Sequence, residues 1–198
     1  MRINRLLIGS VTLAALCAPM VRAQSQGSAP TIQERKQIQQ DRIANGVQSG
    51  QLTAGETKNL ESKEAHLNRE EHNMRAADNG KLTAGDRAAL TRQQNRLSNQ
   101  IYREKHNAAT AHYGNNVVGQ RRENQQDRIA QGIRSGQLTP REAGKLENKE
   151  QGVNREVKGM RQANGGKLTN ADRQAVNQQQ NSLSKQIYNK KHNARTGY

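Results

Sequence analysis

Few side chains in the 198-residue sequence have the type and spacing that catalysis or metal binding needs. Cys17 is the only cysteine, and it lies near the N-terminus. His66 and His72 are six residues apart, whereas two imidazoles share one face of a helix at a spacing of three or four. The sequence has no nucleophile elbow and no phosphate-binding glycine loop. We therefore expect a protein that is not an enzyme and that uses no cofactor and no metal.

Basic side chains are the other group that could act, and they are concentrated in two related segments. The chain has 32 lysines and arginines against 17 acids, a net charge of +15. Residues 87–112 carry five basic residues and one acid, and residues 173–198 carry five basic residues and no acid. On a helical wheel the basic residues of the second segment adjoin its apolar stripe, with Tyr188 at the border. Such a helix suits a polyanion: nucleic acid, acidic polysaccharide, lipopolysaccharide phosphates or an anionic membrane surface.

The predicted polyanion-binding residues come from these two segments: Arg87, Arg92, Arg96, Arg103, Lys105, Arg173, Lys185, Tyr188, Lys190, Lys191, His192 and Arg195. The same charge could instead serve as a solvated face that keeps the protein soluble. A second charged region has mixed signs: Glu61, Glu64, Glu70 and Glu71 interleave with Lys63 and Arg69. At helical spacing this mixture predicts a solvated, salt-bridged face.

A tandem repeat must position these side chains. Residues 39–110 aligned with residues 125–196, an offset of 86, are identical at 43 of 72 positions without a gap. Within each copy a Gly-x-Leu-Thr motif occurs twice, 30 residues apart, and an acid follows each threonine at the third position. The four pairs are Thr53 with Glu56, Thr83 with Asp86, Thr139 with Glu142 and Thr169 with Asp172. This spacing is that of a capping box, so helices should begin there.

The sequence therefore predicts an all-α fold made of two tandem copies of a three-helix, helix-loop-helix unit. Helical periodicity places the helices at 34–48, 54–76, 84–108, 121–134, 140–162 and 170–194. No segment alternates as a strand would. The apolar stripes are narrow, so one copy should be marginally stable alone, and we expect the copies to dock or the chain to form a homo-oligomer.

The loop motif resembles positions 6, 8, 9 and 12 of an EF-hand loop, and the repeats resemble bacterial secreted proteins with GxLTxxE-type helical repeats. Calcium requires six to eight oxygen ligands, yet the preceding ligand positions hold no acid in any of the four loops. The first loop, for example, has Asn45, Val47 and Ser49 there. The resemblance thus implies degenerate EF-hand-like helix-loop-helix units and brings no activity with it. A weak cation-binding or metal-stress protein of the periplasm is the alternative function.

The N-terminus predicts export. Residues 1–23 combine Arg2 and Arg5, an apolar stretch too short to span a membrane, and the small residues Val21 and Ala23 before a polar run. Cleavage after Ala23 would leave no cysteine and no membrane span in the mature chain. The expected organisation is a signal peptide (1–23), a disordered leader remnant (24–33), helical repeat 1 (34–112), a linker (113–120) and helical repeat 2 (121–198).

Composition limits the function further. Phenylalanine and tryptophan are absent, and 31% of residues are hydrophobic. This is too little apolar material for a large enzyme with a deep pocket. We therefore predict an exported, non-enzymatic helical repeat protein, periplasmic or extracellular, that acts as a binding or structural module for an anionic polymer or an envelope surface.

Overall fold

The computed structural model describes residues 29–197, which form six helices and no strand. The helices are α1 (Ile32–Gln48), α2 (Ala54–Ala77), α3 (Ala84–Lys105), α4 (Val117–Arg134), α5 (Pro140–Ala163) and α6 (Asn170–Lys191). The predicted all-α class is confirmed. The predicted signal peptide and residues 24–28 of the predicted leader remnant lie outside the described residues. The prediction of disorder is wrong for Ile32 and Gln33, which begin α1 after the Thr31 capping box.

Threonine side chains start five of the six helices. At α3, the Thr83 hydroxyl accepts a hydrogen bond from the Asp86 amide at 3.1 Å, and the Thr83 amide donates to the Asp86 carboxylate at 2.9 Å. The same reciprocal pair precedes α1, α2, α5 and α6. The four predicted capping boxes are confirmed, and Thr31 with Glu34 adds a fifth. The motif therefore fixes where the helices begin.

The capping box at Thr83 can be tested by substitution. Thr83→Ala removes the acceptor for the Asp86 amide and should lower the free energy of unfolding by about 1 kcal/mol. Thr83→Ser keeps the hydroxyl, so its free energy of unfolding should stay near that of the wild type. Urea denaturation followed by circular dichroism measures both, and an equal loss in the two variants would rule out the cap as the cause.

The segment between α3 and α4 begins and ends earlier in the sequence than predicted. Residues 117–120, expected in the linker, form the first turn of α4, because the Asn116 side chain accepts from the Gly119 amide at 3.2 Å and caps the helix. At the other end of α3, the helix stops at Lys105, three residues early. There the Asn107 side chain accepts from the Ala109 amide at 2.8 Å and turns the chain out of the helix.

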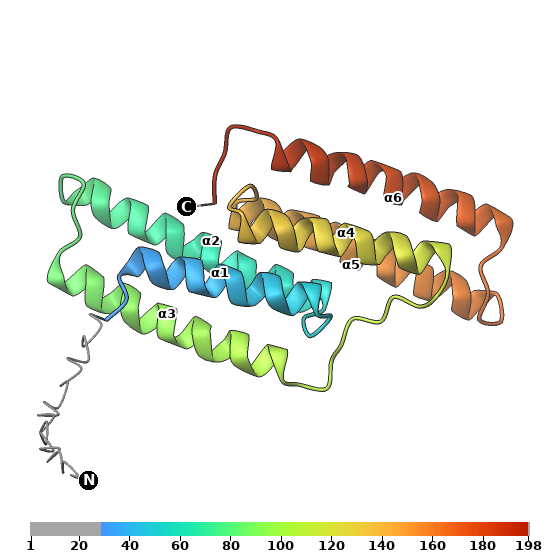
Figure 1. The fold of residues 1–198 in the computed structure, drawn as a ribbon, viewed down its shortest axis with the longest axis horizontal. Helices are drawn as coiled ribbons and strands as arrows, with labels where there is room; N and C mark the ends of the chain where they lie inside the picture. Colours follow the sequence, from blue (N-terminus) through green and yellow to red (C-terminus); the bar gives the residue numbers. More distant parts are fainter. Residues whose placement is uncertain (1–28, 198) are drawn as a thin grey trace, which may run out of the picture.

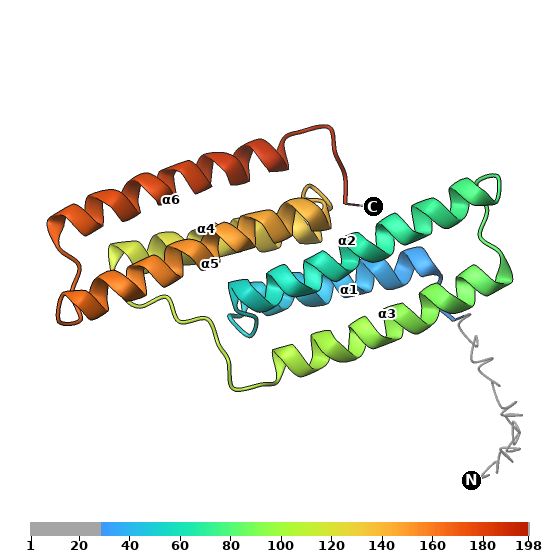
Figure 2. The same cartoon turned by 180° about the vertical axis from the view of Figure 1, so that it is seen from behind.

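Helices α1, α2, α4 and α5 form the centre of the molecule, and α3 and α6 lie at opposite edges (Figures 1 and 2). The largest contacts join the two halves of the chain: α2 packs against α5, and α1 packs against α4. Each pair runs in opposite directions (Figure 1). Between α1 and α4, an Arg134 guanidinium nitrogen donates to the side-chain oxygen of Gln48 at 2.8 Å. These two residues are 86 apart, so equivalent positions of the two halves touch.

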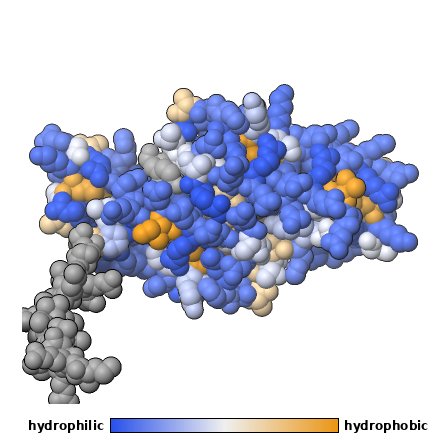
Figure 3. Space-filling view, viewed as in Figure 1, coloured by the Kyte–Doolittle hydropathy of each residue, from blue (hydrophilic) through white to orange (hydrophobic). Residues whose placement is uncertain are grey.

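The apolar core is continuous across both halves. Ile43, Leu60 and Ile101 from the first half and Ile129 and Ile187 from the second are fully buried in one cluster. Apolar side chains appear only as scattered spots on the face shown in Figure 3. The narrow stripes predicted from the sequence therefore do face inward, and docking of the two halves enlarges the core that they share.

Buried glutamines join the outer helices to the inner ones. The side-chain amide of Gln39 donates to the backbone carbonyl of Gln94 at 2.7 Å. The side-chain amide of Gln94 donates to the backbone carbonyl of Ile32 at 2.9 Å, so the two bonds connect α1 to α3. Gln125 and Gln180 make the equivalent bonds between α4 and α6. Because buried polar groups are costly unless they are hydrogen-bonded, these amides fix how α3 and α6 sit on the centre.

Candidate functional site

Three of the predicted basic residues form a stripe along α3. Arg92, Arg96 and Arg103 are spaced by four and seven residues, so they lie within about 40° of one another around the helix. All three are exposed. No side-chain hydrogen bond or ion pair joins any of them to another described residue, so the three guanidinium groups face solvent. We call these three residues the α3 arginine stripe.

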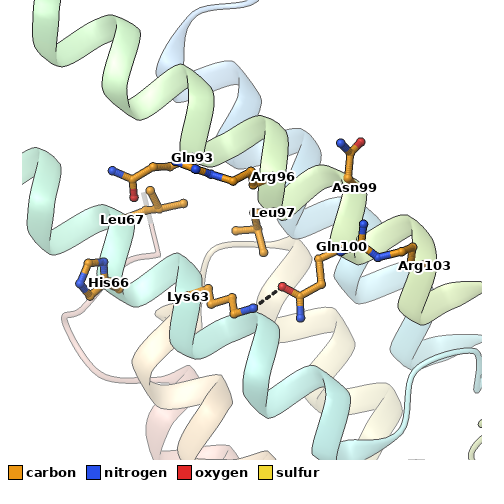
Figure 4. A pocket seen from close by; sticks show the side chains of 9 residues that line it. All are labelled: Lys63, His66, Leu67, Gln93, Arg96, Leu97, Asn99, Gln100 and Arg103. Atoms are coloured by element: carbon orange, nitrogen blue, oxygen red, sulfur yellow. Dashed lines mark hydrogen bonds between the residues drawn. The ribbon is translucent and has the colours of Figure 1, made fainter.

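Two residues of the α3 arginine stripe, Arg96 and Arg103, line a groove between α2 and α3 of about 510 Å³ (Figure 4). Its lining residues are Lys63, His66, Leu67, Gln93, Arg96, Leu97, Asn99, Gln100 and Arg103. Leu67 and Leu97 are buried between the helices, and the Lys63 ammonium group donates to the Gln100 side chain across the groove (Figure 4). The lining includes no acid, although Glu70 lies 3.7 Å from the His66 ring. The groove is therefore open and its charged lining residues are all basic, while the lining Gln93 and Gln100 donate to Glu70 and Glu104 beside it.

The other predicted residues of α3 contact the protein itself. The Arg87 guanidinium donates to the Leu82 carbonyl at 2.5 Å, just before the helix. Lys105 is half-buried, with its side chain against Gly46. Burial, with a smaller effect of the nearby Arg42, lowers the pKa of Lys105. Lys105 is therefore less accessible than the α3 arginine stripe, whereas Arg87 remains exposed and charged.

The basic residues at the end of α6 gather around an acid. Glu142, at the start of α5, has the Lys190 ammonium 3.4 Å and the Arg195 guanidinium 3.9 Å from one carboxylate oxygen, and the Asn193 amide donates to the same atom at 2.8 Å. Burial raises the pKa of Glu142, but these bonds and those of the capping box outweigh it, and the pKa is lowered. Lys191 donates to Gln131 at 2.8 Å. Three residues of the predicted α6 cluster, Lys190, Lys191 and Arg195, therefore contact α4 and α5.

The predicted Tyr188 and His192 form a stacked pair on the surface. Their ring centroids are 4.1 Å apart, and Tyr188 remains 56% exposed. Tyr102 and His106 of α3 make the same pair at 4.2 Å. The prediction included only the α6 pair, although the Lys-His-Asn-Ala context that both copies share could have indicated the other.

The two basic helices do not form one surface. Helices α3 and α6 lie at opposite edges and do not contact each other within the described residues (Figure 1). The groove between α5 and α6, about 380 Å³, has Ser182 at the position equivalent to Arg96. Arg173 and Lys185 are the exposed predicted cations of α6 that no described side chain binds. The α3 edge is consequently the stronger candidate for an anionic partner.

A cluster of glutamates at the contact between α2 and α5 is the feature that the sequence analysis missed. Glu61 and Glu64 of α2 and Glu147 and Glu150 of α5 are each no more than 1% exposed. The prediction of a solvated face for Glu61 and Glu64 is therefore wrong. Glu71 is also buried, and its carboxylate lies 2.6 Å from the Lys36 ammonium. We call the first four residues the buried carboxyl cluster.

Burial raises the pKa of every member of the buried carboxyl cluster. The pKa of Glu61 lies well above its usual value, through burial first and the neighbouring Glu64 second. Burial raises the pKa of Glu64 to about 8 against the opposing charge of Lys36, and that of Glu147 to about 8. Burial likewise raises the pKa of Glu150 to about 7, although Arg122 opposes it. These groups hold protons at pH values where exposed glutamates are ionised.

The acids of the predicted cation-binding loops act within capping boxes. Glu56 accepts from the Thr53 amide at 2.9 Å through one oxygen and from the Asn107 side chain at 2.7 Å through the other. Over residues 29–197, no group of three or more histidines, cysteines or acids is arranged to hold a metal ion. The loops thus offer these oxygens to the backbone and to neighbouring side chains.

Comparison of the chain with protein-family models, with curated proteins and with solved structures finds no match. Among the described helices, none combines the length and the apolar character needed to cross a membrane.

Proposed function

We propose that the chain is an exported, non-enzymatic module of two three-helix units that binds an anionic polymer of the cell envelope or its surroundings along α3. The observation that carries this proposal is the α3 arginine stripe: three exposed guanidinium groups on one face, beside a groove without lining acids. Guanidinium groups are well suited to phosphate, sulfate and carboxylate oxygens because their donors form a planar fork. The regular spacing suits a partner with repeated charges.

The two-unit organisation draws support from contacts that recur 86 residues apart. Gln39 and Gln125 make matching bonds to the outer helices at 2.7 Å, and the Ala111 and Gly197 amides donate to Gly50 and Gly136 at 2.8 Å. Equivalent residues therefore make equivalent hydrogen bonds in the two halves. Under this proposal, duplication preserved the scaffold, while the α3 arginine stripe stands in one copy alone.

Binding to heparin and to polyphosphate tests the function. The wild-type protein should bind both at about 50 mM salt, and its affinity should fall steeply as salt rises, because each contact releases condensed counterions. The triple variant Arg92→Gln, Arg96→Gln, Arg103→Gln should lose at least about ten-fold in affinity, and its salt slope should decrease by about 2 to 3. Fluorescence anisotropy with labelled polymer measures both quantities.

A triple variant on α5, Lys145→Gln, Arg155→Gln, Lys158→Gln, removes the same charge from another exposed surface. It should bind nearly as the wild type does. Equal weakening in both variants would show that the basic residues act only through net charge. Absence of binding at about 50 mM salt, or binding without salt dependence, would refute the polymer as partner. Vesicles with and without anionic lipid, tested in parallel, distinguish an envelope surface from a free polymer.

A further inference from the structure

The buried carboxyl cluster spans the main contact between the two halves. Glu61 and Glu147 occupy equivalent positions, 86 residues apart, and a charge on Glu147 contributes to the raised pKa of Glu61 across the contact. Next to them, Gly144 of α5 packs on the Lys58 carbonyl of α2, with 3.7 Å from an added Cβ to that oxygen. Glu61 therefore lies within the contact between α2 and α5, beside a close approach of the two helices.

The cluster has more acceptors than donors. The Gln40 amide donates to one oxygen of Glu61 at 3.3 Å, and the Gln126 amide donates to one oxygen of Glu147 at 3.0 Å. The other oxygen of each of these glutamates, and one oxygen each of Glu64 and Glu150, is buried without a donor among the described residues. The side-chain oxygen of Gln126 is likewise buried without a donor among the described residues. Protons on the carboxyls would supply the missing donors.

The two cations near the cluster are Lys36, which pairs with Glu71, and Arg122, whose buried Nε has no hydrogen-bond partner among the described residues. Within residues 29–197, no lysine, arginine or histidine nitrogen lies within 4.0 Å of the four carboxyls. The charged and titratable groups facing the cluster are Lys36 from α1, Arg122 from α4, Tyr113 from the segment before α4, and Asp127 near Tyr113. Lys36 pairs with Glu71 at 2.6 Å, and Arg122 lies over the Tyr113 ring at 5.4 Å. Ionised carboxylates would thus be buried without direct counterions.

We infer that the α2/α5 contact is a proton-dependent clasp: the two halves pack tightly while the buried carboxyl cluster is protonated, and the contact loosens when the cluster ionises. Loss of protons would leave several like charges at one buried interface. Opening the contact would let water reach them. The two halves are joined only through the segment before α4, so they can separate there without unwinding a helix.

The direction of the pH effect follows from the raised pKa values. A carboxyl whose pKa is higher in the folded protein than in the unfolded chain contributes stability that is fully present below the unfolded value, near 4.5. That contribution is lost as the pH rises through the folded values of about 7 for Glu150 and about 8 for Glu64 and Glu147. Stability should therefore be higher near pH 5.5 than near pH 9.

Urea denaturation of the full chain at about pH 5.5 and about pH 9 tests the inference. The unfolding equilibrium constant should be at least about 100-fold larger at the higher pH, since each unit of pKa shift corresponds to ten-fold. The double variant Glu61→Gln, Glu147→Gln keeps the shape and removes two charges, so it should lose much of this pH dependence and be more stable than the wild type at pH 9. The exposed pair Glu123→Gln, Glu156→Gln removes the same charge and should retain the wild-type dependence.

Spin labels show whether the pH effect occurs at the contact between α2 and α5. Cysteines placed at the exposed Asn59 and Lys145, in a Cys17→Ser background, report the separation of α2 and α5. The distance between the labels should lengthen or broaden at about pH 9, and the double glutamine variant should suppress this change. Equal stability of the wild type at both pH values, an unchanged pH dependence in the double glutamine variant, or an unchanged label distance would each overturn the clasp.

Discussion

Gly119→Ala should destabilise the protein by about 3 kcal/mol, because an added side chain collides with the backbone. A Cβ at this position would lie 1.9 Å from the Tyr113 carbonyl oxygen and 2.3 Å from the Gly114 carbonyl oxygen. Neither atom can move without shifting the segment that leads into α4. Chemical denaturation measures the loss, and the fluorescence of the tyrosines would report displacement of Tyr113.

Gly159→Ala is the matched control for that substitution. Gly159 lies inside α5, and an added Cβ would meet nothing within 4 Å. Alanine is favoured over glycine in a helix interior, so this variant should gain about 0.5 to 1 kcal/mol. A stability loss in Gly119→Ala together with a stability gain in Gly159→Ala would confirm that the backbone of residues 113 and 114 leaves no room for a side chain at Gly119. A loss of stability below about 1 kcal/mol in Gly119→Ala would contradict it.

Ile101→Ala should destabilise the protein about as much as Gly119→Ala does, for a different reason. Only Leu90, Gln94, Leu97 and Ile101 are buried on α3, and Ile101 is fully buried in the shared core. Its truncation removes apolar contacts and leaves a cavity, at a cost of about 3 kcal/mol. Because so few side chains hold α3, hydrogen exchange should accelerate in α3 before it does in α2 or α5.

Ile38→Ala serves as the comparison, since Ile38 is 48% exposed on α1. It should change stability by less than about 1 kcal/mol and leave exchange in α3 unaltered. The polymer affinity of the Ile101→Ala variant, measured where the protein is still folded, should fall as α3 loosens. Uniform acceleration across all helices would mean that α3 does not open by itself.

The helix starts could be predicted because a local motif determines them. A threonine with an acid three residues later satisfies the first free amides of a helix whatever lies around it, and α2, α3, α5 and α6 begin where the motif places them. The start of α4 was predicted four residues late. Its cap, Asn116, lies among glycine and asparagine residues that resemble a linker, and only the structure shows the bond to the Gly119 amide.

The basic residues of α3 could be predicted from their concentration in the sequence, whereas their separation from α6 could not. Which edges the outer helices occupy depends on how the two halves dock, and no local pattern encodes that. The buried glutamates were missed for another reason. Glu64 is four residues after Leu60 and three before Leu67, so it lies within the apolar stripe of α2. Its charge led to a surface assignment, although its position on the helix indicated the core.

The contact between Gln48 and Arg134 has a bearing on how such a chain could have arisen. When equivalent residues of two halves touch each other, and α1 meets α4 as α2 meets α5, the arrangement is self-complementary in the way of a two-fold homodimer. A single-copy ancestor would have assembled by the same contact, and only above a certain concentration. Joining the two halves in one chain makes that assembly intramolecular, so it no longer depends on protein concentration. The two halves differ at the α3 arginine stripe: at the offset of 86, α6 has Gln178, Ser182 and Asn189 where α3 has the three arginines.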